Sequence, residues 1–266
     1  MEIRTQEKSA RFGRRLSRLS AGGDAAFFLG APLFLGALLC VAGCGGRSTR
    51  SGEPTVETSS MKLGRAKTVS VTLTMGAGEM NVTGDAPDLM NGTFSYNDPA
   101  QKPKIGYVDS SDHAQLTIEQ AEEQHSRVGG DTYSWDVRLN NRVTTELHVQ
   151  LGAGKLNLTL GDLPLTRLHV EMGAGSSRVD LLGNWKHDVD VHLEGGVGNA
   201  TVRLPRSVGV RVEVQGGLGS VSASDFKKNG DAYVNDQFGK SPVTVNVKIE
   251  GGVGKVVLEL AGGPTV

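Results

Sequence analysis

Three histidines in the second half of the chain stand where they could meet carboxylates. His148, His169 and His192 recur at spacings of 21 and 23 residues, and each lies two residues before a Gln or a Glu. Imidazoles and carboxylates together are ligands for divalent transition metals such as zinc. If the surrounding segments are neighbouring strands, the imidazoles form a ladder with a spacing of about 5 Å. A second ladder would run beside it, made of Gln150, Glu171, Glu194, Gln215 and Glu250.

We expect these two ladders to be rows of solvated side chains. A firm metal site needs three or four donors that converge at about 2.1 Å, with further contacts that hold the imidazoles. Side chains on a flat sheet instead project in parallel and diverge with its twist. The sequence therefore predicts no metal-binding residue, no cofactor and only weak association with zinc.

Other residue patterns that would carry catalysis are weak or absent. Glu171 and Glu194 are candidates for the paired carboxylates of a glycan-cleaving enzyme, but no long loop accompanies them to enclose a substrate. No Gly-x-Ser-x-Gly or His-Glu-x-x-His motif occurs. The Gly-x-Gly segments lack the further residues of a phosphate-binding loop. We predict no catalytic residue and no enzyme; a carbohydrate-active β-helix, as a polysaccharide hydrolase or lyase, is the alternative.

Cys44 is the residue with the most specific motif. Val41-Ala42-Gly43-Cys44 matches the bacterial lipoprotein box, and it follows a basic segment and an uncharged run from Ala25 to Val41. We expect residues 1–43 to be a signal peptide, exported by the Sec or the twin-arginine route, and Cys44 to be lipidated. The small and polar residues 44–60 predict a flexible tether. Gly45 after the cysteine favours the outer membrane, facing the periplasm, over the inner membrane if two membranes are present.

A Gly-x-Gly signature organises the remaining chain. It begins at residues 76, 152, 173, 196, 217 and 252. In the last five units the residues five and three before it are aliphatic, and the alternate residues are polar, which is typical of half-buried strands. A second aliphatic strand, such as Leu156–Leu160, follows most of these glycine corners. The predicted inner residues are Leu147, Val149, Leu168, Val170, Val191, Leu193, Val212, Val214, Val247 and Ile249.

These units predict an all-β fold. A period of about 21 residues leaves no room for two strands and a crossover helix. Residues 146–266 are therefore expected to form a β-solenoid, similar to a parallel β-helix, of about five coils, with Val170, Leu193 and Val214 as stacked core residues. Residues 61–145 begin with the same unit and continue as irregular strands, which predicts a separate N-terminal β domain.

Several segments resemble a known family. Met75-Gly-Ala-Gly-Glu-Met-Asn, followed by Leu89–Tyr96 and Lys102-Pro103-Lys104, resembles the N-terminal toast-rack domain. Trp135–Asn140 and Leu147–Leu160 are similar to the continuation of that domain into repeats. Related domains occur in LiaF-type proteins of the cell-wall antibiotic response and in adhesin-like repeats. The resemblance implies a repetitive β fold, and it supplies no catalytic residues.

The composition of the chain limits the classes of partner that are expected. The chain has 28 basic and 29 acidic residues, so no basic excess indicates nucleic acid as a partner. Its 37 glycines in 266 residues are about twice the average share, as expected for repeated corners. We predict a lipid-anchored binding, sensing or structural module of the bacterial cell envelope. The lipid would bind the membrane, and an envelope protein or a cell-wall glycan is the expected further partner.

Overall fold

The computed structural model describes residues 54–121 and 133–262. The predicted signal peptide and Cys44 lie outside the described residues. Fourteen strands of the described chain form one mixed sheet, and a single short 3-10 turn, η1 (Pro99–Gln101), joins two of them. The prediction of an all-β protein is confirmed. Among the residues described, none forms a helix with the length and apolar character needed to cross a membrane.

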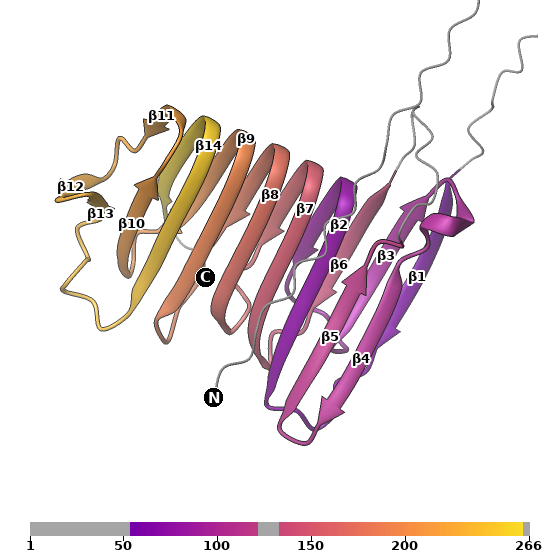
Figure 1. Cartoon of the computed structure of the whole chain (residues 1–266). Coiled ribbons are helices and arrows are strands. Elements are labelled where there is room, and N and C mark those ends of the chain that lie inside the picture. The colour runs from indigo at the N-terminus through magenta and orange to yellow at the C-terminus, as the bar shows by residue number, and fades with distance from the viewer. Residues whose placement is uncertain (1–53, 122–132, 263–266) are drawn as a thin grey trace, which may run out of the picture. The chain divides into compact units, whose positions relative to one another are not determined.

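The fold is built on long strands that bend at their glycines. Figure 1 shows each long ribbon turning back on itself near its middle, so that its two halves lie in two facing layers. The sequence predicted separate strands before and after each corner, but backbone pairing continues on both sides of the glycines and makes each pair one strand. These long strands are β2 (Thr68–Thr83), β7 (Thr144–Thr159), β8 (Leu165–Asp180), β9 (Val189–Pro205) and β14 (Thr244–Ala261).

The long strands pair in parallel and in register, but not in sequence order. The spatial order is β2, β7, β8, β9, β14 and then β10 (Gly209–Gln215). Val170 pairs with Leu193 as predicted, but Leu193 pairs next with Ile249, and Ile249 with Val214. The expected direct stacking of Val214 on Leu193 is therefore wrong. The last unit of the chain inserts between its two predecessors.

The insertion before β14 explains this order. The fourth unit is broken at Gly216 and Gly217, both with positive φ, into β10 and β11 (Leu218–Ser222). The chain then returns through β12 (Lys227–Asn229) and β13 (Ala232–Val234), and β13 pairs antiparallel with one edge of β10. With that edge of β10 occupied, β14 pairs with its other edge and with β9.

The opposite end of the stack is covered by shorter strands. The first half of β2 pairs with β5 (His113–Glu119), which continues to β4 (Lys104–Ser110). The second half pairs with β6 (Ser134–Leu139), which continues to β3 (Met90–Tyr96) and β1 (Thr55–Met61). Residues 55–60, expected within the tether, belong to β1, because pairing with β3 satisfies the backbone of this polar segment.

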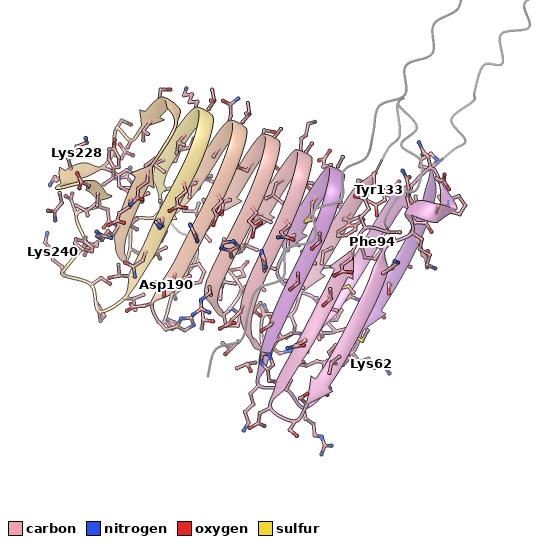
Figure 2. All side chains as sticks on the ribbon, viewed as in Figure 1. Lys62, Phe94, Tyr133, Asp190, Lys228 and Lys240 are labelled. Atoms are coloured by element: carbon pink, nitrogen blue, oxygen red, sulfur yellow. The ribbon has the colours of Figure 1, made fainter. Side chains whose placement is uncertain are left out.

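The core lies between the two layers. The predicted inner aliphatic residues are buried, except that Val214 is only partly so. Trp135 is fully buried and packs edge-to-face on Phe94, with ring centroids 5.7 Å apart. Figure 2 places Phe94 and Tyr133 at the β3 and β6 end of the stack, with Lys228 and Lys240 at the other end. Trp135 and Trp185 are both core residues.

One acidic side chain, Glu57, reinforces the backbone pairing of the edge strand β1. Lys102 Nζ and the Tyr96 hydroxyl donate hydrogen bonds to Glu57 at 2.6 Å and 2.8 Å, and they hold the pKa of Glu57 below its ordinary value. Because this pKa is depressed by folding, the stabilisation is present at neutral pH and is lost as the pH falls through the folded pKa, below 4.5. We expect Glu57→Gln to reduce hydrogen-exchange protection of β1 relative to wild type at pH 7. This difference should shrink at pH 3.5; an equal difference at both pH values would contradict the prediction.

Candidate functional site, a histidine and glutamate ladder

The candidate site lies on the outer face of the layer formed by the first halves of the long strands. In register, His148 of β7 stands beside His169 of β8, and His169 beside His192 of β9. The strand after β9 is β14, which supplies Lys248 to this row. The structure therefore brings the three predicted histidines together. The position of Lys248 was not predicted, because no local pattern indicates that β14 enters the stack beside β9.

The second row is also formed, with one change of order. Gln150, Glu171, Glu194 and Glu250 are successive neighbours, and Gln215 follows Glu250 at the end of the row. The sequence had placed Gln215 before Glu250. This exchange matters because the carboxylate of Glu250 on β14 now lies beside Glu194, which is on the same strand as His192.

The side chains of the two rows converge instead of projecting in parallel. The imidazoles of His148 and His169 meet edge-to-face with centroids 4.8 Å apart, and those of His169 and His192 at 5.0 Å. His148 Nε2 and His169 Nε2 lie 3.1 Å and 3.0 Å from the same Glu171 oxygen. Adjacent strands are close enough for this shared contact, because one carboxylate can reach the imidazole on its own strand and the imidazole on the neighbouring strand.

Both carboxylate oxygens of Glu171 have hydrogen-bond partners. The Gln150 amide donates to its second oxygen at 2.9 Å. This amide, followed by the His169 and His148 imidazoles, holds the pKa of Glu171 below its ordinary value. Glu171 is therefore an anion at neutral pH with hydrogen-bond partners on both oxygens.

The His192 end of the ladder is looser. His192 Nε2 lies 3.5 Å from Glu194 and 3.4 Å from Glu250, and His169 Nε2 lies 3.8 Å from Glu194. His192 Nε2 is shielded from solvent but has no hydrogen-bond partner. Lys248 donates to Glu250 and lowers the pKa of that carboxyl, with a smaller contribution from His192. Two anionic groups thus face a nitrogen that lacks a hydrogen bond.

The glycine corners form a second distinctive surface. In the first three units the residue before Gly-x-Gly is Met75, Leu151 or Met172 and the central residue is alanine. In the last three units the preceding residue is glycine and the central residue is Val197, Leu218 or Val253. Val197 and Val253 are neighbours in register and are 60% and 52% exposed. The exposed pair Val197 and Val253 was not predicted, although the change from Ala to Val in the repeat signals it.

A family model and a solved structure each match more than half of this chain. The model of the N-terminal domain of toast-rack proteins matches residues 50–203. The chain belongs to the toast-rack family. This toast-rack chain is also 34% identical to a candidate cell adhesion protein from Clostridium sporogenes, with a TM-score of 0.76 over 79% of this chain and 100% of that chain. The resemblance drawn from the sequence is confirmed.

More distant structures are similar to the toast-rack chain over a comparable length. A candidate adhesin from Bacteroides fragilis is 9% identical, covers 76% of this chain and 97% of its own, and has a TM-score of 0.27. A candidate adhesin from Parabacteroides merdae is 9% identical, covers 77% and 96%, and has a TM-score of 0.26. No curated protein matches the chain.

Proposed function

We propose that this protein is a lipid-anchored, non-catalytic binding module of the bacterial cell envelope. The observation that carries the proposal is the 34% identity, over the whole of the other chain, to a candidate cell adhesion protein. In a cell with two membranes the anchor would lie in the outer membrane and the domain would face the periplasm. The partner would be an envelope protein or a cell-wall glycan.

The geometry of the described residues favours binding over catalysis. The returns between β7 and β8 and between β8 and β9 are short, at residues 160–164 and 181–188. Neither return is long enough to form a lid over the ladder, whereas enzyme sites are concave and exclude water. Glu171 and Glu194, the carboxylates considered for glycan cleavage, lie on this open sheet face. A broad and regular face suits recognition of an extended partner.

The scaffold for this role would be a β-solenoid. The five repeat units of β7, β8, β9, β10 and β14 each contribute a strand to one parallel row. We assign them as the coils of a solenoid of about five coils. In-register pairing of one unit with the next supports this assignment.

The anchor is tested at Cys44. Cys44→Ala should abolish lipid attachment, because only the thiol of the lipoprotein box accepts the diacylglyceryl group, and the protein should leave the membrane pellet. Intact-mass spectrometry and membrane fractionation measure both effects. Cys40→Ala is the matched control, because Cys40 lies inside the predicted signal peptide, and it should leave the mature mass unchanged. A Cys44→Ala protein of wild-type mass that still sediments with membranes would refute the anchor.

Binding is tested by co-sedimentation of the full chain. Detergent-solubilised protein is incubated with protein-free cell-wall sacculi and, separately, with native envelope fragments before and after protease treatment. Retention on sacculi would identify a glycan partner, and protease-sensitive retention on fragments a protein partner. Absence of retention in all samples would contradict a binding module. Release of soluble sugars from the sacculi would instead support the carbohydrate-active alternative.

A further inference from the structure

We propose that His169, His192 and Glu194 form a binding site for one divalent transition-metal ion, with zinc as the best match to these donors. The sequence alone predicted no metal site, because side chains on a flat sheet were expected to diverge. That premise does not hold at this ladder. One ring nitrogen of each histidine and a carboxylate oxygen of Glu194 lie within 4.8 Å of one another.

The spacing of the donors is close to the spacing that zinc requires. An ion with bonds of about 2.0–2.2 Å in tetrahedral geometry holds its ligand atoms about 3.3–3.6 Å apart. Glu194 Oε1 lies 3.8 Å from His169 Nε2 and 3.5 Å from His192 Nε2. The side chains of His169, His192 and Glu194 are 27%, 31% and 44% exposed, which leaves them room to rotate toward one ion.

The neighbouring triad of His148, His169 and Glu171 is the weaker candidate. Glu171 already accepts hydrogen bonds from Gln150 and is in contact with both imidazoles at 3.0–3.1 Å, so an ion would have to displace these contacts. His192 Nε2, in contrast, is shielded from solvent without a hydrogen bond, which is a state that an ion would relieve.

Charge around the proposed site also suits a cation. Glu250 lies 3.4 Å from His192 Nε2 on the far side from His169 and adds a second carboxylate. Lys248 donates to the other oxygen of Glu250 and competes with an ion for this carboxylate, so three protein ligands and a water are the expected coordination set. His169 Nε2 faces both Glu171 and Glu194, so the ladder would hold one ion and not two.

The ion would link strands β8 and β9 across the middle of the face. Because zinc would bind the folded chain and not an unfolded one, binding must raise the melting temperature. This effect is independent of any partner in the envelope, and of the proposed function.

The test is a zinc titration of the full-length protein in detergent, without a histidine tag, followed by calorimetry and thermal melting. We expect one zinc per chain and a higher melting temperature with zinc. His192→Ala and Glu194→Gln should each weaken binding at least tenfold. His148→Ala is the matched control, because His148 flanks His169 on the other side, and it should change affinity less than threefold.

Metal-free melting curves establish whether each variant is folded. If His192→Ala does not fold, Glu194→Gln still tests the site, because glutamine has nearly the same shape as glutamate. The proposal is overturned if wild-type protein shows no saturable zinc binding. It is equally overturned if His192→Ala and Glu194→Gln bind as wild type, or if His148→Ala loses binding while His192→Ala keeps it.

Discussion

Gly198→Ala is expected to destabilise the protein by about 3 kcal/mol or more, since it combines backbone strain with a clash that has no flexible side chain to relieve it. Gly198 is the last glycine of its corner in β9 and has φ of 147°. A Cβ there would lie 1.8 Å from the carbonyl oxygen of Gly175 on β8. The backbones of successive corners are in contact at this point, so a methyl group would push the strands apart. Urea unfolding measures the change in free energy.

Gly195 provides the matched control on the same strand. It has no positive φ, and a Cβ there would meet nothing within 4 Å. Gly195→Ala should therefore change the free energy of unfolding by less than about 1 kcal/mol. Alanine also lowers the conformational entropy of the unfolded chain, which acts in the stabilising direction. Equal losses for Gly198→Ala and Gly195→Ala would show that the corners are not in backbone contact.

Leu193→Asp is expected to cost several kcal/mol, because it would bury a carboxylate without a partner between two apolar neighbours. Leu193 is 6% exposed and pairs with Val170 on one side and Ile249 on the other. Glu194→Ala, one residue further on and on the outer face, should cost under about 0.5 kcal/mol in metal-free protein. Thermal melting compares the two, and similar losses would mean that the strand faces are assigned the wrong way round.

The sequence was sufficient to predict which side chains of each strand face the core and which face solvent. The alternation of Leu147 with His148 and of Leu193 with Glu194 depends only on the two-residue period of a strand, which local sequence carries. The spatial order was not predictable in the same way. Whether β9 pairs with β10 or with β14 depends on the β12 and β13 hairpin, and the antiparallel pairing of β13 with β10 is a long-range contact without a local signature.

The candidate site was predicted only in part for a related reason. The residues of the ladder followed from register, because equivalent positions of stacked units must be neighbours. The direction in which each side chain points did not follow from register. Whether His192 Nε2 leans toward Glu194 or away from it depends on rotamers, and on Lys248 and Glu250 of β14, whose arrival beside β9 was not foreseen.

The place of β14 has a consequence for how the chain reaches its folded state. β14 follows both β9 and β10 in the chain, yet it lies between them and pairs with both. A chain that ends before Thr244 can stack β2, β7, β8 and β9, but it lacks the strand that joins β10 to them. The exposed edge of β9 is then free to pair with another chain.

Completion of the stack therefore depends on β14. Pairing of β9 with β14 joins residues more than 50 positions apart, such as Val189 and Val245, and such distant contacts form slowly. Until β14 has paired, the edge of β9 stays open to other chains. A chain interrupted before Thr244 keeps this open edge permanently, and the edge distinguishes it from a chain that includes β14.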